Sequence, residues 1–211
     1  PVSSSAKRLA SDPDTSNPDF SSSEADSLHA NAARRPIALA VSFIALGVVG
    51  FIAAFMLTLD KFALLENPDA QLGCNFNLLV GCSTNLNSAQ GEVFGFPNSL
   101  LGIVFWSATV TIGAALLAGA ALARWFWVLY AIATAGSLAL VVWFISQSIF
   151  VLHVLCPWCM VTWAVTIPAF FIVVLHVMRS GAIPLPPRGR GFASAAFGWI
   201  PLMTLVSYLI I

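Results

Sequence analysis

The stretch CPWCMVTWAVTIPAFFIVVLHVM, residues 156–178, sets two cysteines at the head of a long apolar run. Pro157 suits the first position of a helix, where its missing N–H leaves no hydrogen bond unmade. A helix N-terminus stabilises negative charge, and the thiolate is the reactive form of cysteine. Cys156 and Cys159 are therefore expected to open and close a disulfide on the first turn of a membrane helix. The alternative is two small buried hydrophobic residues, but burial alone gives no reason for the two-residue gap.

The composition of the whole chain is that of a membrane protein. Only 9% of the 211 residues are charged, against roughly 25% in soluble domains. The formal net charge is zero, which argues against nucleic acid as a partner because phosphate binding needs a basic face. Apolar runs close to or above the roughly 20 residues that cross a bilayer occupy 36–59, 97–119, 124–152, 156–178 and 192–211. The sequence thus predicts an all-α integral protein of the lipid bilayer. Aspartate, glutamate, lysine and arginine are absent inside these runs, which disfavours an ion or proton pathway.

The segments before and between these runs divide the chain. Residues 1–35 are polar with little apolar periodicity, and we expect a disordered cytoplasmic tail. A long loop, 60–96, separates the first two runs, and the fourth connection, 179–191, is rich in proline, glycine and arginine. We expect 36–178 to hold the first four spans and 192–211 to be an added membrane anchor or packing helix.

Basic residues mark the cytoplasmic side of a membrane protein. With the N-terminus inside, eight of the nine lysines and arginines face the cytoplasm, and only Lys61 lies outside. Asp60 and Lys61 are interpreted as a pair at the membrane edge. The loop 60–96 and the short connection near 152–155 then face outward, and the C-terminus ends outside. We expect a multi-pass plasma membrane protein whose four cysteines all lie on the extracytoplasmic side, where disulfides persist.

Three interpretations of the cysteines compete. A zinc site is disfavoured because Cys74 and Cys82 are farther apart than the about two to four intervening residues of structural zinc pairs. Two static disulfides would explain the even count, but a bridge within C-x-x-C closes a very small ring. The favoured interpretation is that both pairs are redox-active. The loop pair would meet a soluble partner, and the helix-head pair would pass electrons into the membrane.

Electrons that reach the helix-head pair need an acceptor. No haem-ligand set or nucleotide-binding motif is evident, so a lipid-soluble quinone is the simplest acceptor, as in the route that keeps the bacterial periplasm oxidising. Helical spacing places four residues of the fourth span on one face: Cys156, Cys159, Met160 and Trp163. Asn98 opens the second span, and its amide could hydrogen-bond a quinone oxygen. Trp163 as a packing residue and Asn98 as a helix-start residue are equally good interpretations.

Several motifs together are similar to those of bacterial homologues of vitamin K epoxide reductase. They are Gly73-Cys74, Gly81-Cys82, Ser88, FGFPNSLLG at 94–102 and Cys156-Pro157-Trp158-Cys159. The resemblance runs over about residues 58–176, and the five-span form without a fused thioredoxin domain looks like the actinobacterial type. It implies a four-helix catalytic bundle over 36–178 around a quinone, capped by the loop 60–96.

The resemblance also implies roles for the cysteines. Cys159 would be the cysteine that reacts with quinone, and Cys156 would exchange with Cys82. Cys74 would be the shuttle thiol that, together with Cys82, oxidises a thioredoxin-fold partner of DsbA type. Because no thioredoxin domain is fused to the chain, this partner would be a separate protein.

The same resemblance suggests residues that bind the quinone. Asn98 matches an asparagine that binds a quinone carbonyl, and Leu86 and Ser88 match loop positions beside the pocket. Trp163 stands where the animal enzymes carry a tyrosine, and its indole N–H can donate a hydrogen bond but cannot accept one.

The resulting hypothesis is a membrane thiol–quinone oxidoreductase that forms disulfides in secreted proteins, with menaquinone as the expected quinone and without a metal. Quinone-linked oxidases of DsbB type are the nearest rival. In that family the C-x-x-C pair precedes the widely spaced pair, and here the order is reversed. The alternative from another class is a membrane scaffold protein with static extracellular disulfides.

Overall fold

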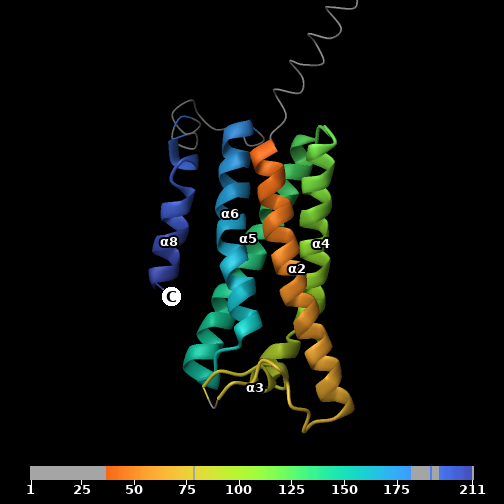
Figure 1. Cartoon of the computed structure of the whole chain (residues 1–211). Coiled ribbons are helices and arrows are strands. Elements are labelled where there is room, and N and C mark those ends of the chain that lie inside the picture. The colour runs from red at the N-terminus through yellow and green to blue at the C-terminus, as the bar shows by residue number, and fades with distance from the viewer. Residues whose placement is uncertain (1–36, 78, 182–190, 192–194, 211) are drawn as a thin grey trace, which may run out of the picture. The chain divides into compact units, whose positions relative to one another are not determined.

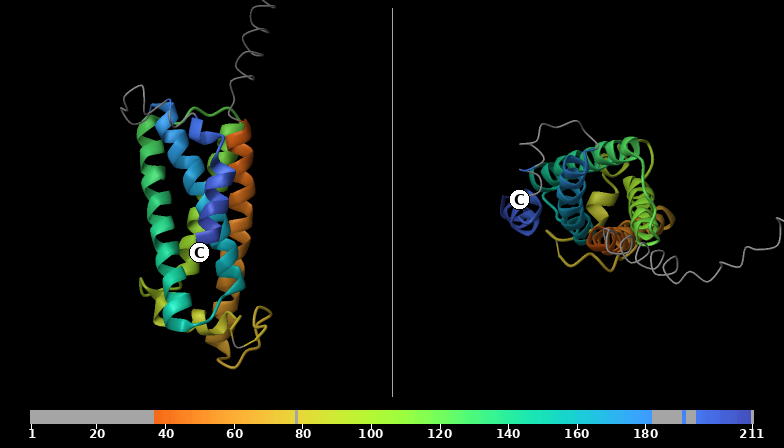
Figure 2. Two further views of the ribbon diagram at one scale, coloured as in Figure 1. Left: turned by 90° about the vertical axis from the view of Figure 1, so that its left-hand side faces the viewer. Right: turned by 90° about the horizontal axis from the view of Figure 1, so that it is seen from above.

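The computed structural model describes residues 37–77, 79–181, 191 and 195–210, and long apolar helices dominate this part of the chain (Figure 1). Four of them are long enough to cross a membrane: α2 (Ile37–Glu66), α4 (Asn98–Leu117), α5 (Arg124–Gln147) and α6 (Pro157–Ser180). Viewed along their axes, these four helices form a ring, and the short helix α3 (Ser83–Leu86) lies across its centre (Figure 2).

Small residues allow α2 and α4 to pack closely. A Cβ atom added at Gly50 would lie 2.3 Å from the ring of Trp106, whose side chain is only 1% exposed. One added at Gly47 would lie 2.7 Å from Val110. Lipid is as apolar as the helix surfaces, so close van der Waals packing has to supply the association energy. These glycines therefore fix the separation of the two helices that flank the cysteine-bearing loop.

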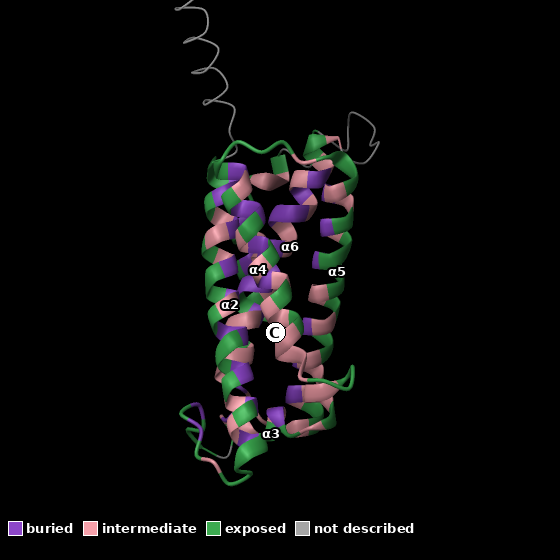
Figure 3. Cartoon of the chain, turned by 90° about the vertical axis from the view of Figure 1, so that its right-hand side faces the viewer, coloured by how far each residue is buried: buried purple, intermediate pink, exposed green. Residues whose placement is uncertain are grey.

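Aromatic side chains fill the half of the bundle that is remote from the cysteines. Phe43 is fully buried and lies edge-on to Tyr130, with 5.8 Å between ring centroids. The hydroxyls of Tyr130 and Thr109 share a hydrogen bond of 2.8 Å that ties α5 to α4. Exposed apolar residues such as Leu129 and Ile132 lie on the bundle surface, where Figure 3 shows the exposed positions. An apolar surface of this kind suits contact with lipid.

The cysteine end of the bundle is closed by residues 67–77 and 79–97, which we call the cap. The cap contains α3 and the 3-10 turn η1 (Ala89–Glu92). At the same end α5 continues into the π-helical turn η2 (Ser148–Leu152). His153 follows in the left-handed conformation, with φ of 52°, and turns the chain toward the head of α6.

A fifth apolar helix, α8 (Ile200–Ile210), lies outside the ring against α6 (Figure 2). Pro168 interrupts the hydrogen bonding of α6, because it has no N–H to donate to the carbonyl four residues earlier. That carbonyl belongs to Ala164, and the hydroxyl of Tyr208 on α8 donates to it. The fifth helix thus supplies the hydrogen bond that the proline removes.

The predicted fold class is confirmed by these helices, and the details refine the expected boundaries. The first helix continues to Glu66, beyond the end of the apolar run at residue 59. The loop expected over 60–96 contains a short helix from Ser83 to Leu86. The fifth span expected over 192–211 is described as a helix from Ile200 onward. The tail 1–35 and most of the connection 179–191 lie outside the described residues.

Candidate functional site

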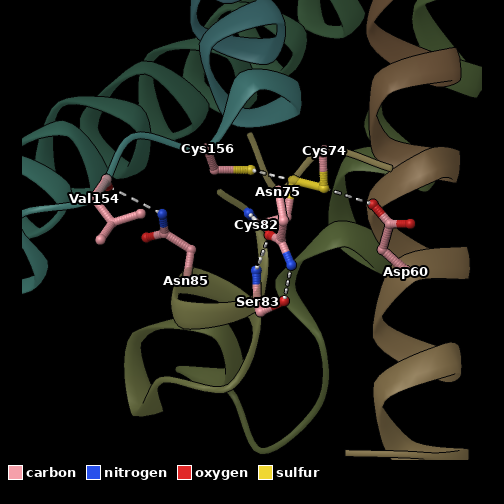
Figure 4. Close-up of a disulfide and its surroundings, with 8 residues drawn as sticks. All are labelled: Asp60, Cys74, Asn75, Cys82, Ser83, Asn85, Val154 and Cys156. Atoms are coloured by element: carbon pink, nitrogen blue, oxygen red, sulfur yellow. Dashed lines mark hydrogen bonds between the residues drawn. A yellow bond between two sulfur atoms is a disulfide. The ribbon is translucent and has the colours of Figure 1, made fainter. Parts of the chain in front are cut away.

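All four cysteines lie at the capped end of the bundle. Cys74 and Cys82 form a disulfide, and Cys156 and Cys159 are free thiols. The Cys156 thiol lies 3.4 Å from the sulfur of Cys82, and both residues are 0% exposed (Figure 4). A thiolate at Cys156 would therefore be within reach of the disulfide, as thiol–disulfide exchange requires.

A short parallel β-bridge sets this approach. The N–H of Leu155 donates to the carbonyl of Leu79 at 2.9 Å, and the carbonyl of Leu155 accepts from the N–H of Gly81 at 3.0 Å. The next residues along the two segments are Cys82 and Cys156. The register of the bridge consequently brings these two sulfurs together.

Two asparagine side chains hold the cap in this position. The Oδ1 atom of Asn75 accepts from the N–H groups of Cys82 at 2.9 Å and Ser83 at 3.3 Å. The amide of Asn85 donates to the carbonyl of Val154 at 3.2 Å, which joins α3 to the segment before α6 (Figure 4). The first asparagine fixes the disulfide, and the second fixes the cap against the helix that carries the free thiols.

Asp60 of α2 approaches the other sulfur of the disulfide. Its Oδ2 atom lies 3.3 Å from Cys74 Sγ. The two sulfurs are bonded to each other, so they offer no thiolate to a metal ion in this state. The adjacent Lys61 is directed elsewhere, to the carbonyl of Leu86 at 2.8 Å and to Glu92 at 3.0 Å. Asp60 and Lys61, expected as a pair at the membrane edge, therefore contact different partners. All of these partners belong to the cap.

A largely apolar cavity of about 570 Å³ lies within the bundle beside Cys159. Its volume falls within the roughly 300–1,000 Å³ of small-molecule sites. The apolar walls come mainly from α4 and α5, and polar side chains gather toward the cap. The lining residues at that end include Asn85, Leu86, Ser88, Gln90, Asn98, Gln147, Cys159 and Trp163. The cavity therefore joins a free thiol to an apolar slot with a few polar groups.

Asn98 carries an unused acceptor in this cavity. Its Nδ2 atom donates to the carbonyl of Gln90 at 2.6 Å. Its Oδ1 atom is buried and has no hydrogen-bond partner among the described residues. Buried polar atoms in folded proteins are almost always paired. A hydroxyl group on a bound molecule would satisfy this atom.

The structure places most of the sequence-predicted site residues together. Cys159, Asn98 and Trp163 line the same cavity, and so do the cap residues Leu86 and Ser88. Their contact with a quinone stays a prediction. Met160 was expected on the face of Cys159 and Trp163, but it is 37% exposed and does not line the cavity.

Cys74 and Cys82 were expected to react with a soluble partner protein, but both are too deeply buried for such a protein to reach them. Cys74 is 5% exposed and Cys82 is 0% exposed. Reaction with another protein therefore needs the cap to move away from the bundle.

Most of the remaining site residues could not be recognised from the sequence. Asn75, Asn85 and Gln147 resemble the polar residues of any loop or helix end, and only the folded chain shows their contacts. Asp60 offered one signal, because it is an acidic residue at the end of an apolar run that leads into a cysteine-bearing loop.

The chemistry of the free pair is asymmetric. A hydrogen bond from Cys159 lowers the pKa of the Cys156 thiol, while burial and the negative charge of Asp60 act in the opposite direction. Because a thiol of lower pKa leaves more readily, this shift favours Cys156 as the sulfur that is released in an exchange with Cys82. Cys159, which lines the cavity, is left to face a bound molecule.

Comparison with known proteins adds one finding. The model of the Vitamin K epoxide reductase family matches residues 41–174, which is more than half of the chain. The matched region runs from α2 to α6 and contains all four cysteines. A search of curated proteins finds no match.

Proposed function

Because the chain belongs to the vitamin K epoxide reductase family, we propose that it is a membrane thiol–quinone oxidoreductase that forms disulfides in secreted proteins. One observation carries the proposal. A disulfide, a free thiol 3.4 Å from it and a second free thiol beside an apolar cavity follow one another across the capped end of the bundle. This order offers a path for two electrons from the cap to the cavity.

The exchanges along this path balance as follows. A reduced partner opens the Cys74–Cys82 disulfide and leaves with its own two cysteines oxidised. Cys82 then attacks a Cys156–Cys159 disulfide at Cys156, and Cys159 leaves as a thiolate. Cys74 next attacks Cys82, which restores the first disulfide and releases Cys156. The reduced Cys156–Cys159 pair gives its two electrons and two protons to a quinone, which becomes a quinol.

The disulfide pattern of the structure corresponds to one stage of this cycle. The cap pair is oxidised and the helix-head pair is reduced, which is the stage that awaits a quinone. The unpartnered Oδ1 atom of Asn98 supports a ligand here, since it could accept a hydrogen bond from a quinol hydroxyl. The Trp163 indole can donate to a quinone carbonyl, and Leu86 and Ser88 form the cavity wall on the cap side. We infer that menaquinone is the quinone.

The partner in this proposal is a separate thioredoxin-fold protein of DsbA type on the extracytoplasmic side of the plasma membrane. Two cap residues near the disulfide support a protein contact there, because Phe76 and Leu79 are 71% and 67% exposed. Large apolar side chains at the surface are typical of protein contact sites. Opening of the cap would then accompany binding of the partner.

An anaerobic assay tests the proposed function. Purified full-length protein, reduced partner and a menaquinone are mixed, and quinone absorbance is followed. The Cys159→Ser variant should lose quinone reduction, and the Met160→Leu variant should retain it because this neighbour lies outside the cavity. If Cys159→Ser reduces quinone as fast as the parent protein, the assigned route is wrong.

Trapped intermediates test the order of the exchanges. Cys82→Ala or Cys156→Ala should accumulate a mixed disulfide, either with the partner or between the two pairs, that is visible on non-reducing gels. The absence of any trapped species in both variants would contradict the relay.

The burial of the cap disulfide favours a second candidate, a membrane scaffold with static disulfides. Alkylation after incubation at a glutathione-like redox poise separates the two. A static bridge resists reduction there, whereas a catalytic disulfide opens and its thiols are labelled.

A further inference from the structure

The thiol–disulfide exchanges at the cap require a group that accepts and returns the thiol protons. Thiols lose a proton when they attack a disulfide, and the thiolates that leave must regain one. At the capped end Asp60 places a carboxyl oxygen 3.3 Å from Cys74 Sγ. In Figure 4 the side chains of Cys156, Cys82, Cys74 and Asp60 follow one another in a row. The carboxyl group therefore stands behind the disulfide, on the side away from the free thiol.

The surroundings of Asp60 favour proton exchange with sulfur over a structural ion pair. Both sulfurs of the disulfide lie within 4.8 Å of its oxygen. The adjacent cation, Lys61, is engaged by Glu92 and by a cap carbonyl. Cys156 at the head of α6 also lies near enough for the charge of Asp60 to raise the pKa of that thiol. An ionised, half-buried carboxylate facing sulfur lone pairs gains nothing from them, whereas a protonated one can donate a hydrogen bond to Cys74.

We propose that Asp60 is the general base that takes the thiol proton of Cys74 as this cysteine re-forms the Cys74–Cys82 disulfide. The inference deepens the proposed function and rests on it. The step starts from a Cys82–Cys156 disulfide. The Cys74–Cys82 bond forms and the Cys82–Cys156 bond breaks, and the electron pair of the broken bond stays on Cys156 as a thiolate. The Cys74 proton moves to Asp60 Oδ2.

The contacts in the structure are those expected immediately after this step. Cys156 lies 3.4 Å from the sulfur that it has left, and Asp60 lies 3.3 Å from the sulfur that it has deprotonated. The same carboxyl can return its proton when the partner releases Cys74 as a thiolate. Asp60 would thus donate a proton when the partner reduces the cap disulfide and accept one when that disulfide re-forms. Over one full cycle, Asp60 neither gains nor loses a proton.

The test starts from full-length protein with all four cysteines reduced, mixed anaerobically with excess menaquinone. Four thiols supply electrons for two quinones. The first quinone is reduced directly by the Cys156–Cys159 pair, and the second only after electrons arrive from Cys74 and Cys82. Quinone absorbance should therefore fall in two phases, and only the second phase includes deprotonation of Cys74.

The Asp60→Asn variant should keep the first phase and slow the second about a hundredfold near pH 7, the lower end of general-base contributions. The ratio of the parent rate to the variant rate in the second phase should fall about tenfold per pH unit as the pH rises, because a growing fraction of Cys74 ionises without a base. Asp60→Glu should recover the pH profile of the parent protein. Glu66→Gln removes a carboxylate from the exposed end of the same helix and should change neither phase.

The two phases separate the ways in which this reasoning can fail. An unchanged second phase in Asp60→Asn would overturn the assignment. Equal slowing of both phases, with a pH profile parallel to that of the parent, would show a structural role and overturn it as well. A parent protein that consumes no quinone in either phase would overturn the proposed function, and the role of Asp60 would fall with it. The first phase also reports whether each variant is folded.

Discussion

Replacing Lys61 with methionine should loosen the cap over the cavity. The side chain of Lys61 is 7% exposed, and its Nζ atom contacts the Leu86 carbonyl at 2.8 Å and Glu92 at 3.0 Å. Methionine has a similar length and can fill the same space, but it supplies neither interaction. The variant leaves a buried carbonyl on the cap without its donor. The cap should therefore separate from α2 more often.

The contacts set the size of the effect. A hydrogen bond to a charged group contributes about 1.5–3 kcal/mol, and we take about 2 kcal/mol because partial exposure weakens the ion pair. That change makes the open cap about 30 times more populated. Cys156 is 0% exposed beneath the cap, so a water-soluble maleimide reaches it only in the open state. Its alkylation rate, measured by mass spectrometry of the labelled peptide, should rise by the same factor.

Two matched variants separate the interactions. Glu92→Gln removes the ion pair and leaves the bond to the Leu86 carbonyl, so its labelling rate should rise only a few-fold. Lys61→Arg keeps the charge and a donor, and it should label more slowly than Lys61→Met. If Lys61→Met labels within about threefold of the parent rate, an effect below roughly 0.7 kcal/mol, the lysine does not hold the cap and the reasoning is refuted.

Three further changes, one of them with a matched control, test other contacts. Asn98→Ala should raise the inhibition constant of the quinol product about tenfold, the cost of the hydrogen bond that Oδ1 would accept from it. Because the substitution also removes the bond to the Gln90 carbonyl on the cap, alkylation of Cys156 should rise a few-fold; an unchanged quinol inhibition constant would remove this side chain from the quinone site. Gly50→Ala forces a methyl group against the ring on α4 and should destabilise the protein by about 1–3 kcal/mol in thermal unfolding followed by tryptophan fluorescence. Gly136→Ala, where an added Cβ meets nothing within 4 Å, should be neutral, and equal effects of the two would contradict the packing argument. Tyr208→Phe should cost about 1 kcal/mol and lower the thermal midpoint by roughly 2–4 °C with activity retained, whereas no shift would mean that its hydrogen bond does not stabilise α6.

The sequence was informative where one physical effect dominates. Apolar runs long enough for a bilayer predicted the helices, and the distribution of lysine and arginine predicted that the four cysteines share one end. Cys156 and Cys159 were recognisable from their spacing alone. Asn98 was recognisable from its place at the start of a span and from the motif around it.

The rest depends on contacts between distant segments. The approach of Cys82 to Cys156 is set by a β-bridge that pairs a loop residue with the turn before α6, and no local pattern predicts that register. Lys61 and Asp60 look alike in the sequence as charged residues at the end of an apolar run. Helical geometry sends their side chains in different directions, one to the cap carbonyl and one to the disulfide. Roles that arise from such directions become visible only in the folded chain.

The hydrogen bond from α8 to α6 has a consequence for how this architecture can vary among relatives. No water in hydrocarbon can replace a lost donor, so Pro168 in α6 is least costly while the Tyr208 hydroxyl serves the Ala164 carbonyl. Proline and tyrosine should therefore be gained and lost together. Deleting the fifth helix should be tolerated best when Pro168 is also replaced by alanine, so that a minimal four-helix enzyme would need this compensating change.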